Sequence, residues 1–185
     1  MESFEILVVR AQAGDKEAFG QLYSGYFTPI YRFLYWRTKH KETAEDLTQT
    51  VFLKAYEAMS AYKSTGAPFL SWLYTIARNL YLDHSKKKKS ILPDDPEIFW
   101  DAMAQTGPAT DKMSHEREDR EALAGALAEL TDEQQEIVIL RFIEERSYEE
   151  IAEITDKSEE ALRALNYRAM KTMKSRLKKK YKEEL

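Results

Sequence analysis

The 185-residue chain contains no cysteine and only three histidines, His40, His84 and His115. The absence of cysteine excludes disulfides, thiolate metal sites and cysteine nucleophiles, and it suits a reducing compartment. The histidines lack the spacing of metal ligands, and the chain has neither a glycine-rich phosphate loop nor a nucleophile elbow. We therefore expect no catalytic residue, no metal and no cofactor, and a small helical hydrolase or metal enzyme finds little support.

Long apolar runs are also absent from the chain. No run reaches the ~18 residues of a membrane-spanning helix, and Glu2 and Glu5 interrupt any basic-then-apolar leader. Hydrophobic residues make up 43% of the chain and charged residues 32%, a balance typical of globular proteins. The sequence therefore predicts a cytoplasmic protein with no membrane insertion.

The alternating pattern of a β-strand is missing as well, since nearly every periodic stretch repeats at three to four residues. Residues 90–115 interrupt this pattern with an acidic segment that contains Pro93, Pro96 and Pro108. We predict an all-α fold with two small helical domains. An N-terminal helical bundle would cover residues 1–89 and a C-terminal helix-turn-helix domain residues 116–185, joined by a linker at residues 90–115.

Charge is unevenly distributed along the chain, although the net charge is only −4. Residues 1–90 carry a net +4, residues 91–120 a net −5, and residues 121–185 a net −3. Within the last block, Asn166 to Lys182 contains eight basic residues and no acidic one. Because the local field governs contact with phosphates, this basic segment is compatible with nucleic-acid binding despite the negative total.

The C-terminal segment has the pattern of a helix-turn-helix. Tyr148, Ile151, Ala152 and Ile154 would bury a short helix, three polar residues follow, and a second periodic stretch begins at Ser158. The pattern favours a reader of duplex DNA, although similar helix pairs occur in bundles that bind no DNA. In the second helix Leu162, Leu165, Ala169 and Met173 would be buried, which leaves Glu160, Arg163, Tyr167, Lys171, Lys174 and Lys178 outward.

The predicted helix at residues 43–60 has more apolar residues than one buried face requires. Its core stripe would consist of Ala44, Leu47, Val51, Ala55 and Ala58. The opposite side combines acidic and amide groups with an apolar one, and Phe52 lies beside the stripe; the outward residues are Glu42, Asp46, Gln49 and Leu53. This mixture favours a protein-docking surface, and an ordinary solvated face with one exposed leucine is the alternative.

The predicted helix at residues 67–87 has a second face outside its core stripe of Phe69, Leu73, Ile76, Ala77, Leu80 and His84. Aromatic, amide and cationic groups line this face, namely Trp72, Thr75, Asn79, Leu82 and Lys86, flanked by Tyr74, Arg78 and Tyr81. Such a combination suits single-stranded nucleic acid, because rings stack on bases while cations follow the backbone. Simple packing of the aromatic rings is the alternative. The preceding loop, residues 60–68, would form either a pocket for an extruded base or an ordinary turn.

Three segments together resemble the extracytoplasmic-function (group IV) sigma factors of RNA polymerase. The first is Gly14–Phe19 with Leu22, Tyr23 and Tyr26; the second comprises Ala44–Tyr56 and Phe69–Asp83; the third is Leu130–Lys171. Within the third, Ser147–Ile154 nearly reproduces the family pattern. Order and spacing agree as well as composition, and the resemblance covers roughly the whole chain outside the linker.

The resemblance implies a transcription initiation factor whose partners are core RNA polymerase, promoter DNA and an anti-sigma protein. Asp46, Gln49, Phe52 and Leu53 would bind the clamp helices of the largest polymerase subunit. The minus-ten element would be opened and its non-template strand held by Trp72, Thr75, Arg78, Asn79 and Lys86, with a flipped base in the loop of Ser64, Thr65 and Gly66. The minus-thirty-five element would be read by Glu160, Arg163, Tyr167, Arg168, Lys171 and Lys174.

The recognition helix departs from the family pattern. Glu159–Leu165 stands where the family often has Val-Gly-Thr-Val-Lys-Ser-Arg, so the resemblance does not give the bases that are read. Glu159 and Glu160 either stabilise the helix N-terminus, which we prefer, or accept from cytosine amino groups. Two other functions fit parts of the chain: an autonomous helix-turn-helix repressor, and an adaptor that binds polymerase and blocks it.

Overall fold

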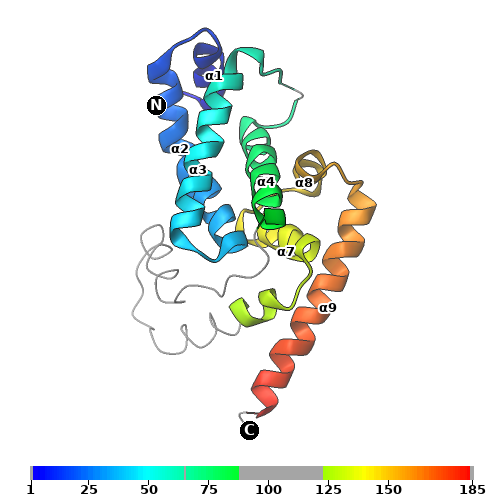
Figure 1. Ribbon diagram of the computed structural model, residues 1–185. Coiled ribbons are helices and arrows are strands. Elements are labelled where there is room, and N and C mark those ends of the chain that lie inside the picture. The colour runs from blue at the N-terminus through cyan, green and yellow to red at the C-terminus, as the bar shows by residue number, and fades with distance from the viewer. Residues whose placement is uncertain (1, 65, 88–122, 184–185) are drawn as a thin grey trace.

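The computed structural model describes residues 2–64, 66–87 and 123–183, and within these ranges it contains helices and no strand. The N-terminal half consists of α1 (Phe4–Gln12), α2 (Lys16–Thr38), α3 (Lys41–Ala58), the 3₁₀ turn η1 (Met59–Ala61) and α4 (Phe69–Lys87). The C-terminal half consists of helical residues 123–128, α7 (Asp132–Val138), the π-helical turn η2 (Ile139–Ile143), α8 (Tyr148–Thr155) and α9 (Glu159–Glu183). The all-α prediction is confirmed (Figure 1). The predicted linker lies outside the described residues.

Several helices begin at side chains that satisfy free backbone N–H groups. The Asp15 carboxylate accepts from the N–H groups of Glu17 and Ala18 at the start of α2. Ser147 and Glu150 form a capping box at the start of α8. Asp156 then adopts a left-handed conformation, φ 56°, which ends α8 and turns the chain toward α9.

The buried face of α3 differs from the predicted stripe, of which Leu47 is only half-buried. Ala44, Val51 and Ala55 are buried as expected, but Ala58 is exposed because α3 ends there and η1 turns Met59 inward instead. Thr48 is fully buried, and its hydroxyl donates to the carbonyl oxygen of Ala44, which satisfies the polar group within the core.

The C-terminal half buries the apolar residues that periodicity predicts. Ile151 and Ile154 of α8 are buried, while Tyr148 and Ala152 are half-buried. The four predicted buried positions of α9, Leu162, Leu165, Ala169 and Met173, are all buried. None of the helices in the described residues is both long and apolar enough to cross a membrane.

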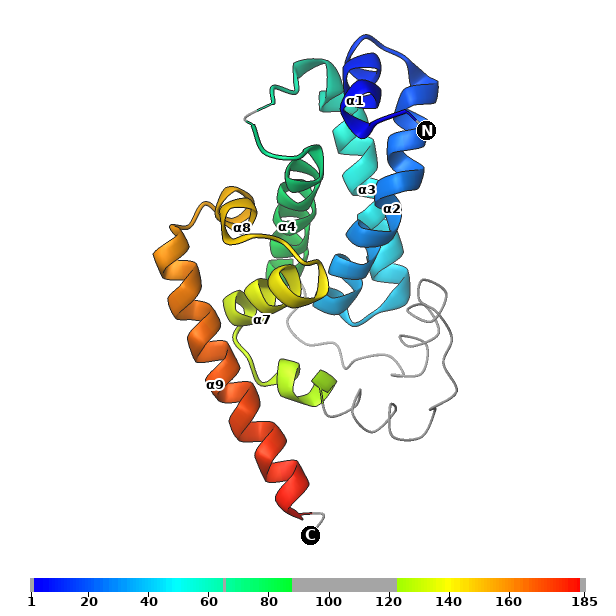
Figure 2. The same ribbon diagram turned by 180° about the vertical axis from the view of Figure 1, so that it is seen from behind.

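The two halves pack directly against each other. In Figures 1 and 2, α8 lies beside α4, and α7 lies near the end of the N-terminal bundle. The buried residues of both halves belong to one continuous cluster. As a result, α4 is covered on one side by α2 and α3 and on another by the C-terminal half.

Candidate nucleic-acid interface

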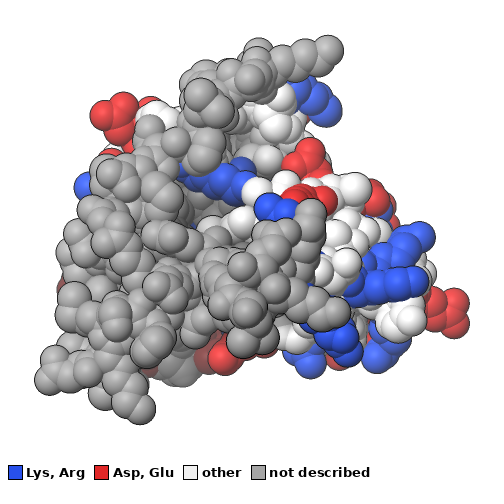
Figure 3. All heavy atoms as spheres, turned by 90° about the horizontal axis from the view of Figure 1, so that it is seen from below, with Lys and Arg blue, Asp and Glu red and all other residues white. Residues whose placement is uncertain are grey.

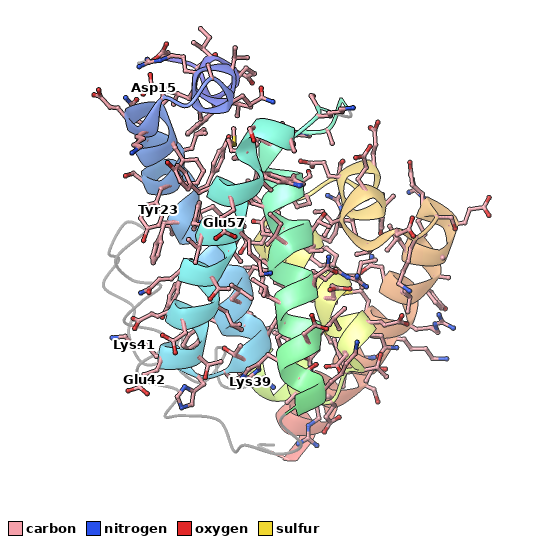
Figure 4. All side chains as sticks on the ribbon, turned by 45° about the horizontal axis from the view of Figure 1, so that its top comes forward. Asp15, Tyr23, Lys39, Lys41, Glu42 and Glu57 are labelled. Carbon is pink, nitrogen blue, oxygen red and sulfur yellow. The ribbon has the colours of Figure 1, made fainter. Side chains whose placement is uncertain are left out.

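The outward face of α3 presents acidic, amide and apolar groups together. Asp46 and Gln49 are exposed, and Leu53 retains 58% of its accessible surface. Tyr56 continues this face one turn further and is also exposed; its spacing of three residues from Leu53 could have identified it from the sequence. We call Asp46, Gln49, Leu53 and Tyr56 the α3 surface. Glu42, which begins the same predicted stripe, lies on the side of the molecule away from α8 and α9 (Figure 4).

Phe52 does not belong to the α3 surface, although the sequence predicted it there. Its side chain is only 4% exposed, and its ring packs edge-on against the ring of Tyr23 on α2, with centroids 4.7 Å apart. Phe52 is rotated by about 100° from Leu53 around the helix, which turns it toward α2. It therefore stabilises the packing of α2 on α3, and the prediction of a docking role for Phe52 is wrong.

The predicted outer face of α4 is partly accessible. Trp72 is half-buried, and its ring packs against those of Tyr62 and Phe69, with centroids 4.7 and 5.3 Å away. Thr75 is half-buried and donates to the carbonyl oxygen of Ser71, whereas Asn79 and Lys86 are exposed. We call Trp72, Thr75, Asn79 and Lys86 the α4 surface.

A pocket of about 170 Å³ lies beside the start of α4. Its lining comes from the loop after η1, from α4 and from α8, and consists of Tyr62, Lys63, Ala67, Pro68, Ser71, Trp72, Thr75 and Glu153. Ser64 and Gly66 are exposed in the same loop, and Gly66 has φ 96°, which favours glycine. Thr65 lies outside the described residues. The buried Ser71 hydroxyl has no hydrogen-bond partner among the described residues.

The residues that flank the predicted α4 face are engaged by the protein itself. Tyr74 is fully buried, and its hydroxyl donates to Glu144 at 2.7 Å. Burial, reinforced by the nearby carboxylate, raises the pKa of Tyr74, so its phenol remains a donor. Tyr81 is also buried, beneath the guanidinium of Arg37. The flanking rings expected beside Trp72 are therefore core residues.

Three arginines of the N-terminal half reach groups of the C-terminal half. Arg78 Nε donates to both carboxylate oxygens of Glu136 at 3.1 Å. Arg32 donates to Glu144 at 2.7 and 2.8 Å, and these hydrogen bonds raise the pKa of Arg32. Arg37 donates to the backbone carbonyl oxygen of Asp132. Arg78 was predicted to bind nucleic acid, but in this arrangement it binds a carboxylate.

The residues of α9 that were predicted to read the minus-thirty-five element are all exposed, and we call them the α9 surface: Glu160, Arg163, Tyr167, Arg168, Lys171 and Lys174. Arg163 pairs with Glu159 at 2.7 Å, and its guanidinium lies 4.5 Å from the centroid of the Tyr148 ring. Tyr167 is 71% exposed. Lys and Arg side chains gather on the right-hand side of Figure 3, the side on which α9 lies. No group of acidic or histidine side chains in the described residues is arranged to hold a metal ion.

Comparison with known proteins assigns both halves to one family. The family model described as Sigma-70 region 2 matches residues 22–91, and that described as Sigma-70, region 4 matches residues 120–173. The chain is 30% identical to the ECF RNA polymerase sigma factor SigM of Bacillus subtilis over 84% of the chain and 92% of SigM. It is 40% identical to the ECF RNA polymerase sigma factor BldN of Streptomyces coelicolor over 90% of the chain, but it spans only 63% of BldN.

A solved structure shares the fold. CnrH, determined in complex with the cytosolic domain of CnrY, matches with a TM-score of 0.71 over 94% of this chain and 96% of CnrH. The identity is 21%, so this match bears on the fold alone.

Proposed function

The chain belongs to the extracytoplasmic-function family of RNA polymerase sigma factors. From this membership we propose which of its three surfaces binds core polymerase and which bind the two promoter elements. It is a promoter-specific transcription initiation factor. The observation that carries this conclusion is the presence of both sigma regions in the family order. The same observation does not favour an autonomous repressor, which would need no Sigma-70 region 2.

We propose that residues 1–89 form the domain that binds polymerase and the minus-ten element, and residues 116–185 the domain that reads the minus-thirty-five element. Residues 90–115 would connect them. The protein would act in the cytoplasm, where RNA polymerase works, and without catalysis of its own. Strand separation would be favoured because the factor binds the separated strand better than the duplex.

The α3 surface is proposed to bind core polymerase. Its exposed Leu53 and Tyr56 offer apolar area, while Asp46 and Gln49 supply polar contacts at the rim, which is the composition of many protein interfaces. This surface lies away from the C-terminal half, as the position of Glu42 indicates, so polymerase could reach it in the arrangement described (Figure 4).

Replacing both Asp46 and Gln49 by alanine should weaken polymerase binding without unfolding the protein, because both side chains are exposed. We expect a loss of roughly five- to thirtyfold in affinity, equivalent to about 1–2 kcal/mol. Fluorescence titration of the sigma factor with core polymerase would measure it. The matched control is Glu17→Ala with Gln21→Ala, an exposed acidic and amide pair on α2. Equal affinity of the two double variants would contradict the assignment.

The α4 surface and the adjoining pocket are proposed to hold the non-template strand of the minus-ten element. Trp72 offers a ring at the edge of the pocket, Asn79 an amide, and Lys86 a cation. These groups match the needs of single-stranded DNA, which binds by base stacking and by backbone contacts. The pocket beside Trp72 would receive a flipped base.

The α9 surface is proposed to contact the minus-thirty-five duplex. The N-terminal part of a recognition helix usually meets base edges, so Glu160 and Arg163 occupy the reading positions. Lys171 and Lys174, two to three turns further on, are placed for phosphates.

Lys174→Ala should weaken binding of the holoenzyme to all upstream sequences by a similar factor. Loss of one phosphate contact should also reduce the slope of log K against log salt concentration by about 0.9. Binding titrations at several salt concentrations, on two different upstream sequences, would measure both effects. Lys16→Ala, which removes the same charge from an exposed position on α2, is the control. A loss confined to one base pair would contradict a phosphate contact.

An anti-sigma protein is proposed as the regulator. CnrH, whose fold the chain shares, was solved with the cytosolic domain of CnrY. By analogy, a protein partner would bind the present chain and control its access to polymerase. The absence of cysteine in the sequence is consistent with a signal sensed by another protein rather than by a thiol of this chain.

A further inference from the structure

The outward face of α9 has an apolar centre, formed by Ala164 and Tyr167. Both residues are exposed, and Tyr167 retains 71% of its accessible surface, the largest fraction among the exposed large hydrophobic residues that the structure describes. In Figures 1 and 2, α9 runs along one edge of the molecule, and α7 and α8 pack against its inner side. The apolar centre therefore lies on the side of α9 that faces away from the rest of the C-terminal half.

Cationic side chains flank the apolar centre. At about 100° per residue, Ala164 is rotated by about 40° from Glu160 around the helix, and Tyr167 by about 20° in the opposite sense. Arg163 is rotated by about 60° to one side of Glu160 and Arg168 by about 80° to the other. Both arginines are exposed. The middle of the face thus presents a methyl group and an aromatic ring, and positive charges stand at its margins.

This order of groups matches the inside of a DNA major groove. Base edges form the floor of the groove and phosphates line its walls, so the middle of an inserted helix meets bases while its margins meet the backbone. Thymine is the base that presents an apolar group in the major groove, its C5 methyl. Alanine and aromatic side chains pack on that methyl, but they leave the hydrogen-bonding groups of other base edges without a partner.

The charges around the apolar centre select duplex DNA as its occupant. Exposed apolar groups rimmed by polar ones mark interaction surfaces. Arg163, Arg168 and Lys171 form this rim, and Lys174 extends it by one turn, whereas Glu160 is the acidic group at its N-terminal end. A predominantly basic rim complements a polyanion.

Helix geometry limits where the contacted methyl lies. Tyr167 follows Arg163 by four residues, or about 6 Å along the helix axis. Base pairs are spaced by about 3.4 Å, so the two side chains reach pairs that are at most about two steps apart. Ala164 is adjacent to Arg163 in the chain, and the same limit holds for it.

We propose that Ala164 and Tyr167 read the C5 methyl of a thymine in the minus-thirty-five element, within about two base pairs of the pair that Arg163 contacts. The methyl packs against the Ala164 side chain and the Tyr167 ring. Binding removes the apolar surface of all three groups from water, which favours thymine over a base that lacks the methyl. This inference rests on the proposed function of the α9 surface.

The first experiment locates the methyl group on the DNA. Promoter duplexes with a randomised minus-thirty-five element are selected for binding to the holoenzyme, and each thymine of the selected element is then replaced by deoxyuridine, which removes the methyl alone. A T·A pair should be enriched, and its uracil duplex should bind about three- to fivefold more weakly. With a C·G pair at this position, 5-methylcytosine should bind more tightly than cytosine. Absence of an enriched T·A pair, or equal affinity for every uracil duplex, would overturn the proposal.

The second experiment assigns the methyl contact to the two side chains. The ratio of affinities for the thymine and uracil duplexes cancels general changes in polymerase or DNA binding. This ratio should fall toward unity in Tyr167→Ala and in Ala164→Gly. The controls Phe142→Ala and Ala128→Gly make similar changes at exposed positions of the same half outside α9, and they should keep the wild-type ratio. A wild-type ratio in both α9 variants would overturn the proposal.

A further variant tests which part of Tyr167 makes the contact. Tyr167→Phe retains the ring and should keep the wild-type ratio, because the methyl packs on the ring rather than on the hydroxyl. Loss of the ratio in Tyr167→Phe would contradict this packing. Weaker binding of Tyr167→Ala to core polymerase, with an unchanged thymine-to-uracil ratio, would make the apolar centre a protein contact and overturn the proposal.

These experiments separate failure of the methyl contact from failure of the proposed function. If the holoenzyme selects no sequence in the randomised element, the reading function of the α9 surface fails together with this inference. If it selects a sequence but binds thymine and uracil duplexes equally, the reading function stands and the methyl contact alone is refuted. Far-ultraviolet circular dichroism checks that α9 remains helical in Ala164→Gly. Should that variant unfold, Tyr167→Ala still decides, since its side chain is 71% exposed.

Discussion

Replacing Trp72 by alanine is expected to reduce promoter opening roughly 5- to 150-fold, since stacking of a base on an aromatic side chain contributes about 1–3 kcal/mol. Trp72 is the large ring of the α4 surface that borders the pocket. Its contribution is made only with an unpaired base, so binding of the variant to core polymerase should stay close to that of the wild type. Permanganate reactivity of unpaired thymines in the minus-ten element would measure opening, and a fluorescence titration would measure polymerase binding.

Two further variants distinguish stacking from packing. Trp72 also contacts the rings of Tyr62 and Phe69, so its removal is expected to lower the stability of the N-terminal bundle around the start of α4. Trp72→Phe retains a ring and should recover part of the opening, and thermal melting should be recorded for both variants. Phe142→Ala removes an exposed ring from η2 and should leave opening unchanged. If the loss of promoter opening in Trp72→Ala and Trp72→Phe only parallels the decrease in melting temperature of each variant, the result would argue against stacking.

The sequence predicted well those features that depend on neighbours along one helix. The buried positions of α9 were correct because Leu162, Leu165, Ala169 and Met173 repeat at three to four residues, and the helix is long and regular. The start of α8 at Ser147 likewise carries a local signal, since serine followed three residues later by glutamate forms a capping box.

Features at the margins of a buried face were predicted less well. Phe52 lies one residue after the buried Val51, and periodicity alone does not show that α2 covers this side of α3 as well. Ala58 was expected in the core because it continues the helical period, but it is the last residue of α3. There the chain changes to a 3₁₀ turn, in which each residue rotates by about 120° rather than 100°.

Contacts between distant parts of the sequence could not be predicted. Arg78 and Tyr74 were placed beside the predicted nucleic-acid face, which is consistent with their positions around α4. Their partners, Glu136 and Glu144, lie 58 and 70 residues further along the chain. No local pattern in a single sequence records such a pairing, because periodicity reports only which side of a helix is covered.

Replacing Arg163 by alanine should lower affinity for the minus-thirty-five element by about 1–3 kcal/mol at one base pair, or roughly 5- to 150-fold, if Arg163 reads a base. The guanidinium is positioned for this role. It lies against the Tyr148 ring and pairs with Glu159, and this ion pair is exposed and therefore weak. Exchanging Glu159 for a DNA acceptor would thus cost little, and the guanidinium would have to leave only an exposed ion pair.

The charge-preserving variant Arg163→Lys separates base reading from attraction to phosphate. Lysine keeps the positive charge but lacks the planar pair of donors that binds guanine through two hydrogen bonds. If Arg163 reads a base, Arg163→Lys should lose discrimination at that base pair almost as fully as Arg163→Ala, while its affinity for other sequences changes little. Holoenzyme binding to a set of upstream duplexes, each substituted at one base pair, would measure this. Full recovery by lysine, with an equal loss on every duplex for alanine, would instead make Arg163 a phosphate contact and leave sequence reading to other residues of the α9 surface.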